Sequence, residues 1–398
     1  MSAPASNVTT KEYFDYQGFG GKLLFTAAVA VVSLALAAVG GFFSAKQFAF
    51  SWLFAFAFFF TIAAGSLFWI LVHHAVDADW SVVVRRQLEN IAWLFPVLAV
   101  LFIPIVLCAP TLFKWMNIAP GVDPLLDGKV AYLNEPFFWI RAVFYFGFFS
   151  LAAFLLRRNS VRQDKDGDAR HTWLSRKMVF PMLPFFALSL TFGAFDWLMG
   201  LDFHWFSTMW GVYIFAGSAL SSMCVLVLLI TALRSAGYLE GIVTIEHYHI
   251  MGKLMLAFTI FWAYITFSQY MLIWYSNIPE ETVYFILRNT GSWWYLQIFL
   301  VAGHFFLPFL LLLMNFGKRS PAFLCGMALW ILTMHALDIY VIVMPVLHRS
   351  GFHPSFMDLF ALLAIGCTLA AVYLKRLGDA SLFPVKDPRL AKSIALKN

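Results

Sequence analysis

The stretch "AFSWLFAFAFFFTIAAGSLFWILV", residues 49–72, is apolar from end to end apart from the hydroxyl groups of Ser51, Thr61 and Ser66. A membrane-spanning helix needs about 20 consecutive apolar residues, and this run is long enough. Further runs of the same kind begin near Gly21, Asn90, Pro136, Met178, Trp205, Ile250, Ser292, Ala322 and Phe356. The sequence therefore predicts ten transmembrane helices.

The composition excludes a soluble globular domain. Of the 398 residues, 62% are hydrophobic and only 12% are charged. The apolar runs are long and rich in Phe and Trp, unlike the short alternating strands of a membrane β-barrel. We therefore expect an all-α polytopic membrane protein in which residues 1–398 form a single integral membrane domain. The first residues lack the pattern of a cleaved signal peptide, so the first predicted helix is expected to stay.

The basic residues predict the orientation of the chain. Most Lys and Arg side chains lie on the side shared by both termini, above all in Arg157–Lys177 and Lys375–Lys397. Cytoplasmic loops carry such an excess, so residues 1–20 and the basic tail 377–398 are expected to be cytoplasmic. Arg157–Lys177 and the opposite segment Ala109–Glu135 are predicted to be surface loops. The net charge of +6 then reflects topology and affinity for anionic membrane lipids, and needs no nucleic-acid partner.

The four cysteines give no sign of a metal centre. Cys108, Cys224, Cys325 and Cys367 occur singly, and the sequence contains neither CxxC nor CxxCH. Iron–sulfur clusters, structural zinc and c-type haem are therefore not predicted in this chain.

Two similar short stretches suggest an internal duplication. Residues 63–68 read "AAGSLF" and residues 215–220 read "FAGSAL", and each is followed by a basic turn and a helix with an acidic start. A repeat would imply two similar four-helix units, as in other membrane proteins. Small residues at this spacing also serve plain helix packing, and both interpretations stay open.

One predicted helix, beginning near residue 245, carries a polar stripe. At 100° per residue, one face of this helix holds Glu246, His249, Lys253, Tyr264 and Ser268. Glu246 can pair with Lys253 or His249 at helical spacing, whereas Thr266 and Gln269 lie on the opposite face. The stripe predicts either a polar route through the membrane or a seam between helices, in which Lys253 snorkels to the surface.

A second polar cluster lies at the cytoplasmic end of the second predicted helix. His73 and His74 are four and three residues before Asp77, so either imidazole can share a helix face with the carboxylate. A carboxylate raises the proton affinity of a nearby imidazole, which would make a proton uptake point. Structural use and ligation of a metal or haem are the alternatives.

A third cluster lies towards the outer side of the membrane. Asp196, Asp202 and His204 fall within one short segment, and His335 and Asp338 are three residues apart, a spacing that suits proton transfer. His304 is the only ionisable residue near the centre of its predicted helix. It is either a satisfied core residue or a bridge between the inner and outer clusters.

Two further classes of function stay open. His304 and His335 could ligate a haem if they faced each other at the same depth. Prolines interrupt several predicted helices, as in secondary transporters, at Pro96, Pro104, Pro181, Pro184 and Pro308.

Three long motifs resemble a known family. These are "GSLFWILVHHAVDADWSVVVRRQLEN" (65–90), "FDWLMGLDFHWFSTMWGVYIFAGSA" (195–219) and "FWAYITFSQYMLIWYSNIPEET" (261–282). They resemble the NrfD-like, or polysulfide reductase-type, membrane subunits of bacterial alternative complex III, and most closely the smaller, ten-helix type. The resemblance covers essentially the whole chain.

The resemblance implies a subunit of a quinol:electron acceptor oxidoreductase in the bacterial inner (cytoplasmic) membrane, delivering electrons to cytochrome c or another carrier in respiratory or photosynthetic electron transport. It implies two four-helix bundles plus two further helices, with no metal in this chain. The expected partners are a larger NrfD-like subunit with the quinol site, an iron–sulfur subunit and c-haem subunits.

The resemblance leaves three possible roles for this chain: a scaffold, a proton route or a quinone pocket. The predicted proton route begins at one set of residues, namely His73, His74, Asp77, Glu246, His249 and Lys253. It continues through Tyr264, Ser268 and His304 and ends near His335, Asp338 and Asp196. A quinone or quinol pocket is the alternative, with aromatic walls and proton acceptors from Asp202, His204, Trp205 and Trp210.

Overall fold

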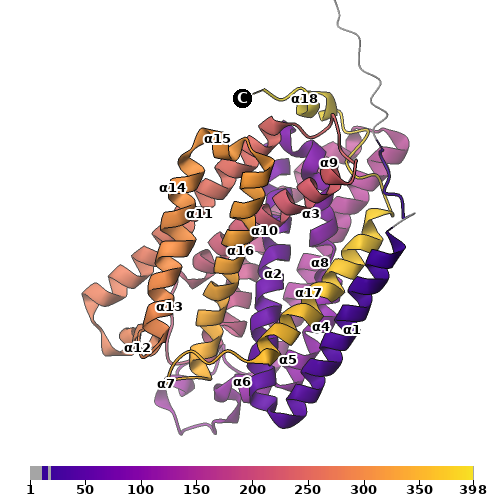
Figure 1. Cartoon of the computed structure of the whole chain (residues 1–398). Helices are drawn as coiled ribbons and strands as arrows, with labels where there is room; N and C mark the ends of the chain where they lie inside the picture. The colour runs from indigo at the N-terminus through magenta and orange to yellow at the C-terminus, as the bar shows by residue number, and fades with distance from the viewer. Residues whose placement is uncertain (1–10, 17–18, 398) are drawn as a thin grey trace, which may run out of the picture.

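In the computed structural model, which describes residues 11–16 and 19–397, all regular elements of the described part are helical (Figure 1). Ten helical segments of this part are long and apolar enough to cross a membrane. The prediction of an all-α, multi-pass membrane protein is therefore confirmed at this level.

Eight of these segments are single helices, bounded as follows: α1 (Gly20–Phe43), α2 (Ala45–Ala75), α8 (Glu135–Asp166), α9 (Arg170–Trp197), α10 (Trp210–Ser235), α11 (Ile245–Ser276), α16 (Pro321–Val343) and α17 (Phe356–Leu377). The third segment is interrupted, as η1 (Asp79–Ser81), α3 (Val82–Ala92), α4 (Phe95–Leu101) and α5 (Ile103–Leu107). Pro96 and Pro104 cause these breaks near the starts of α4 and α5, since proline lacks the amide donor.

The remaining segment consists of α13 (Trp293–Leu300), the π-helical η4 (Val301–Phe306) and α14 (Leu307–Leu313). Short elements lie at both ends of the long helices. They are α6 (Ala109–Leu112), η2 (Lys114–Asn117), α7 (Pro124–Asp127), η3 (Met199–Asp202), α12 (Pro279–Arg288), α15 (Asn315–Lys318), η5 (Met344–Val346) and α18 (Leu390–Ile394).

Helices α2 and α10 form the middle of the molecule and pack closely on each other. We call α2, α3–α4, α8 and α9 the first helix group, because they pack on one another. The second helix group consists of α10, α11, α13–α14 with η4, and α16. Helices α1 and α17 lie side by side along one edge and pack on α2 (Figure 1).

The contact between α2 and α10 depends on small residues. Gly65 lies so close to the main chain of Ser218 that a Cβ atom would overlap the Ser218 carbonyl. The hydroxyls of Ser66 and Ser218 donate to carbonyls of their own helices, at 2.9 and 2.7 Å, so neither is left unpaired in the seam. The two similar stretches, 63–68 and 215–220, therefore meet here and serve helix packing.

The charged segment that was expected to be a loop is mostly helical. Helix α8 continues to Asp166 and α9 begins at Arg170, so only three residues separate them. Two of its charged side chains bond neighbouring elements: Asp164 accepts from Arg86 at 2.6 Å, and Arg157 donates to Asn90 at 3.1 Å. A basic composition predicted the side of the membrane but could not predict these partners.

Residues 11–16 and residues 379–397 lie on the same side of the helices, and we call this side the termini end and the opposite side the far end. The Leu382 amide donates to the carbonyl of Glu12 at 2.8 Å, and the Tyr16 hydroxyl donates to the Lys375 carbonyl. The expected tail is not a free extension. Residues 379–395, which we call the C-terminal strap, lie across the ends of the helices and include buried side chains such as Leu382 and Phe383.

Candidate functional site

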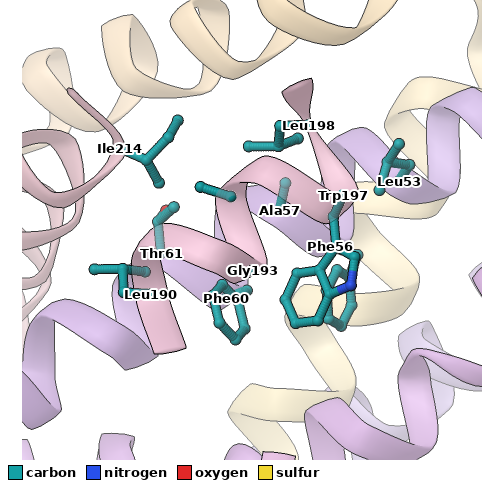
Figure 2. A pocket seen from close by; sticks show the side chains of 11 residues that line it. Leu53, Phe56, Ala57, Phe60, Thr61, Leu190, Gly193, Trp197, Leu198 and Ile214 are labelled. Atoms are coloured by element: carbon teal, nitrogen blue, oxygen red, sulfur yellow. The ribbon is translucent and has the colours of Figure 1, made fainter. Parts of the chain in front are cut away.

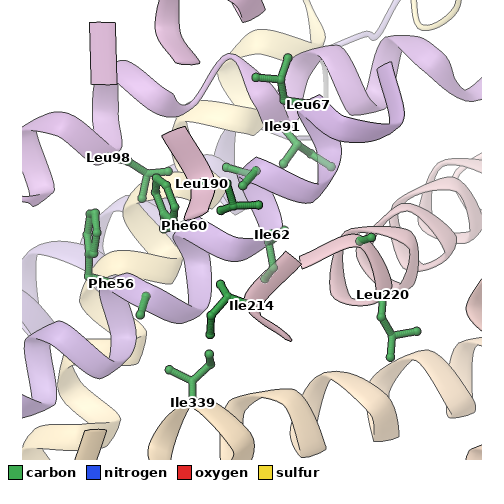
Figure 3. Close-up of a cluster of buried hydrophobic side chains, with 14 of the residues drawn as sticks. Phe56, Phe60, Ile62, Leu67, Ile91, Leu98, Leu190, Ile214, Leu220 and Ile339 are labelled. Atoms are coloured by element: carbon green, nitrogen blue, oxygen red, sulfur yellow. The ribbon is translucent and has the colours of Figure 1, made fainter. Parts of the chain in front are cut away.

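The centre of the first helix group is aromatic and tightly packed. Rings from α2, α4, α8 and α9 meet there, including Phe60, Phe149 and Trp197, with the Phe60 and Trp197 centroids 5.0 Å apart. Figure 3 shows Phe56 and Phe60 among the buried side chains of this region. The cavity beside these rings has a volume of about 10 Å³, which suffices for about one water molecule (Figure 2). The centre of the first helix group is therefore filled mainly by aromatic side chains.

The centre of the second helix group is polar. His335 and Asp338 project from α16 one turn apart, Tyr213 comes from α10, Trp262 from α11 and His304 from η4. All five side chains are buried. We call these five residues the central polar cluster, and it is the candidate functional site.

Asp338 is held by two neutral donors. The Tyr213 hydroxyl donates to one carboxylate oxygen, and Trp262 Nε1 donates to the other at 3.0 Å. Among the described residues, no ion pair reaches Asp338. A buried carboxylate without a cation can take up and release a proton more readily than one fixed by an arginine.

The ring of His335 contacts the Thr61 hydroxyl. Its Nε2 lies 2.9 Å from Thr61 Oγ1, which also lies 2.7 Å from the Phe58 carbonyl oxygen. His335 Nδ1 has no hydrogen-bond partner in the described part of the chain. Gly217 makes room for this ring, because a Cβ atom there would lie 2.7 Å from His335 Cε1.

His304 lies on the π-helical turn η4. Its ring packs at a tilt against that of Trp262, with centroids 4.0 Å apart, and lies 6.4 Å from the ring of His335. The side chain is fully buried, and neither ring nitrogen has a hydrogen-bond partner among the described residues. Trp330 donates to the Gly303 carbonyl at 2.7 Å and so compensates for the irregular backbone. Single π-helical turns are frequent at functional sites.

A cavity of about 60 Å³ connects Asp338 with the far end of the second group. Its polar lining residues are Thr266, Gln269, Arg288 and Gln297, and its aromatic ones include Trp210 and Tyr284. This volume can hold a few water molecules. Arg288 lines the cavity and lies 3.4 Å from Asp202, which is partly exposed. Burial raises the pKa of the Tyr284 hydroxyl above its usual value despite the opposing effect of Arg288, so this group stays protonated.

The polar stripe of α11 does not line the interior, which corrects the expected route. Tyr264 is 62% exposed, and Lys253 is also exposed on the outer surface of the helix. The buried face of α11 instead carries Trp262 and Gln269. Helical periodicity shows which residues share a face, but the neighbouring helices decide which face is buried.

At the termini end of α11, Glu246 pairs with a different residue than expected. Its carboxylate accepts from Arg319 at 2.5 Å, whereas His249 Nδ1 lies 3.9 Å away. Ser268, further along α11, is partly buried and lies outside the central polar cluster. The structure therefore separates Glu246, His249 and Lys253 from the cluster.

His73 and His74 do not pair with Asp77. Asp77 has a positive φ of 54° in the turn after α2, and its carboxylate accepts from Arg176 at 2.9 Å and from Arg389 at 2.7 Å. Both histidines are buried, and the ring of His73 lies between Trp69 and Trp80. The left-handed turn moves the carboxylate off the helix face that the spacing predicted.

Asp196 is far from being a free proton acceptor. Arg141 donates to both of its carboxylate oxygens, at 2.9 and 2.7 Å, and Tyr145 donates to one of them at 2.9 Å. This bidentate pair lies in the first helix group, so Asp196 does not join His335 and Asp338 as expected.

The four quinone-pocket candidates are divided between two cavities and the surface. Trp210 lines the internal cavity, and Asp202 pairs with Arg288 at its far end. His204 is turned outwards, where its Nε2 lies 2.6 Å from Asp123. Trp205 stacks on Tyr284 with centroids 4.1 Å apart and also lines a separate groove.

This groove, which we call the outer groove, has a volume of about 390 Å³ and opens at the far end of α9. Its walls are mostly apolar and aromatic and include Phe192, Phe203 and Trp205. Lys129 lies at the groove and donates to the Phe203 carbonyl at 2.7 Å. Partial burial lowers the pKa of Lys129, although Asp123 opposes the shift.

Sequence reasoning missed Thr61, Tyr213 and Arg288 as members or neighbours of the site. Thr61 is one of three hydroxyl residues in the apolar run 49–72, and Tyr213 follows the third polar cluster in sequence. Arg288 is one of the few basic residues expected on the outer side. These signals were present, but only the packing shows that the three side chains meet Asp338, His335 or the cavity.

Comparison with known proteins finds no matching family model and no matching curated protein. Within the described residues, no three His, Cys, Asp or Glu side chains form a group that could hold a metal ion. The functional interpretation therefore rests on the motifs and on the geometry of the site.

Proposed function

We propose that this chain is an integral membrane subunit of a quinol:electron acceptor oxidoreductase of the alternative complex III type, located in the bacterial cytoplasmic membrane. In this proposal it corresponds to the smaller of the two NrfD-like subunits, known as ActF. The three long motifs support the proposal, as do the ten spans. The two helix groups and the α1–α17 pair are compatible with two four-helix bundles plus two further helices.

The proposed role of the chain is scaffold and proton route, while electrons move through iron–sulfur and haem groups of partner subunits. The observation that carries this role is the central polar cluster beside a cavity with room for water. Asp338 can exchange a proton with water in the cavity, and Arg288 and Asp202 line its way to the far end.

His304 and His335 extend the route towards the middle of the membrane. Both have a ring nitrogen without a partner in the described structure, so either can accept a proton without first breaking a hydrogen bond. Both termini are cytoplasmic in this proposal, so protons would leave through the cavity to the outer side.

Proton translocation by the intact complex in liposomes tests the proposed route. Asp338→Asn and His304→Leu should each lower the number of protons moved per quinol oxidised by about tenfold or more, because each removes a proton-accepting group. Asp358→Asn is the matched control, since Asp358 is also a buried carboxylate but accepts from Ser51 of α2 at 2.5 Å and from Tyr340 of α16 at 3.2 Å, and it does not line the cavity beside Asp338. Unchanged translocation in both route variants, with normal quinol oxidation, would leave only the scaffold.

A quinone pocket is the second candidate, and the outer groove favours it. The groove is large enough for an aromatic head group and has aromatic walls, and Trp205 Nε1 is a buried donor with no partner in the described chain. Lys129 and Trp205 could donate to quinone carbonyl oxygens.

Photolabelling with an azidoquinone tests the outer groove in membranes that contain the complex. Label is expected on residues 128–133 and 192–206, and Trp205→Leu should reduce it. Trp210→Leu is the control, because Trp210 lines the internal cavity and not the groove. Label confined to other subunits would contradict a pocket in this chain.

A further inference from the structure

The C-terminal strap is anchored to the first helix group by side-chain and main-chain contacts. Gln87 of α3 donates to the Leu382 carbonyl at 2.6 Å, and Asp164 of α8 accepts from the Ser381 hydroxyl at 2.8 Å. At its end, α18 rests on η1 and α3. The strap thus closes over the turn that connects α2 with the third span.

Ion pairs hold the middle of the strap. The side chain of Asp387 is completely buried between Arg85 of α3, at 2.7 Å, and Arg389, at 3.0 Å. Arg389 in turn donates to Asp77 in the turn after α2, at 2.7 Å. Burial alone would raise the pKa of Asp387, but the two arginines hold it below its usual value, so the carboxylate remains ionised.

Two histidines with unused ring nitrogens lie directly beneath these ion pairs. Both nitrogens of His74 and Nδ1 of His73 are buried and have no hydrogen-bond partner in the part of the chain described. Arg85, Arg389 and Asp387 are the charged groups whose fields act on His74. Buried polar groups normally have partners, so this unpartnered pair suggests a site that meets water at some stage.

The last turn of the strap covers the other side of this pair. The Ser393 hydroxyl donates to the Trp80 carbonyl at 2.9 Å and accepts from the Val83 amide at 3.4 Å. The Trp80 ring lies 5.0 Å from that of His73. Lifting the strap would therefore remove Arg389 from His74 and loosen Trp80 above His73.

The rim of the strap is less firmly held than its middle. Lys392 lies 3.4 Å from Asp79; the lysine side chain is well exposed and the aspartate is partly exposed. Asp77 is also partly exposed where it meets Arg389. Exposed ion pairs contribute little to stability, so opening can start at this rim.

We propose that the C-terminal strap is a lid that controls the access of water to the His73–His74 pair. This inference extends the proposed proton route at its cytoplasmic end and rests on that function for its physiological meaning. The lid itself can be tested without any measurement of proton movement.

Histidine modification by diethyl pyrocarbonate tests the lid in membranes that contain the full-length protein, with mass spectrometry to locate the label. In the wild-type protein, His73 and His74 should react slowly. Arg389→Gln breaks the ion pairs to Asp387 and Asp77, so labelling of the pair should rise by roughly tenfold or more. Lys392→Gln, which changes only the exposed rim, should label like the wild-type protein.

His304 and His335 serve as internal controls, because they are buried far from the strap and should stay unlabelled in every variant. Ser393→Ala provides a second opening variant that keeps all charges, and it should give an intermediate increase. The lid is refuted if His73 and His74 label equally in the wild-type protein and Arg389→Gln. It is also refuted if His304 is labelled together with them in both opening variants.

A separate measurement distinguishes failure of the lid from failure of the proton route. If labelling responds to Arg389→Gln while proton translocation is insensitive to Asp338→Asn, the strap covers the histidines but the proposed route is wrong. If translocation depends on Asp338 and labelling does not respond to Arg389→Gln, the route stands and the lid is rejected.

Discussion

The two helix groups differ in the side chains that fill their centres. The first is filled by aromatic rings such as Phe60, Phe149 and Trp197, and the cavity beside them holds about 10 Å³. The second holds His304, His335 and Asp338 beside a cavity of about 60 Å³. One half therefore has a closely packed aromatic centre, and the other has buried ionisable side chains beside a larger cavity.

The difference between the two groups is clearest in the partners of two buried aspartates. Asp196 of the first group is fixed by a bidentate pair with Arg141. Asp338 of the second group accepts only from Tyr213 and Trp262, which are neutral. The first arrangement favours structural stability, and the second favours exchange of protons.

The largest expected effect comes from removing the charge of Asp196. Asp196→Asn would leave Arg141 buried without a counter-charge, which costs about 3–5 kcal/mol of stability. Asp338→Asn keeps its neutral partners and should cost about 1–2 kcal/mol. Thermal unfolding in detergent measures both, and equal losses would remove the distinction between the two aspartates.

The next largest loss of stability is expected from a substitution in the contact between α2 and α10. In Gly65→Ala the new methyl group would overlap the Ser218 carbonyl and push α2 away from α10, at a cost of about 1–3 kcal/mol. Gly147→Ala is the control, because a Cβ atom at Gly147 meets no neighbouring atom. It should stabilise the protein by up to about 1 kcal/mol, since alanine favours helix more than glycine does. Unfolding temperatures that do not separate the two variants would contradict the close approach at Gly65.

Lowering the pH is expected to reduce stability by a smaller amount, through protonation of Asp387 at the termini end. The pKa of Asp387 is lowered in the folded protein, so its pairing contributes stability above about pH 4, its unfolded value, and is lost as the pH falls below it. The unfolding temperature of the wild-type protein should therefore fall more steeply below pH 4 than that of Asp387→Asn. Parallel curves would show that Asp387 is not ionised when folded.

The smallest effect on stability is expected at His304. Its ring nitrogens have no partners among the described residues, so His304→Leu breaks no hydrogen bond and should change stability by less than about 1 kcal/mol. The same variant should lose proton translocation. A large loss of stability would indicate that His304 is a structural core residue and not part of the route.

The sequence allowed more of the fold to be predicted than of the site. The positions of the ten apolar runs agree with the ten spans, because length and hydropathy are local properties. His335 and Asp338 both lie on α16, one helical turn apart, as their sequence spacing indicates. The residues of the polar stripe share one face of α11. This face is turned outwards at Tyr264, so it does not line an internal route.

The sequence by itself determined that this chain is a helical membrane protein, since apolar runs of this length can satisfy their backbone in lipid only as helices. Its ten apolar runs also correspond to the ten candidate spans of the described residues. Tertiary structure alone decided which helix faces are buried, and that the strap covers His73 and His74. Contacts such as Arg389 with Asp77, 312 residues apart, depend on how the helices pack, and local spacing does not encode them.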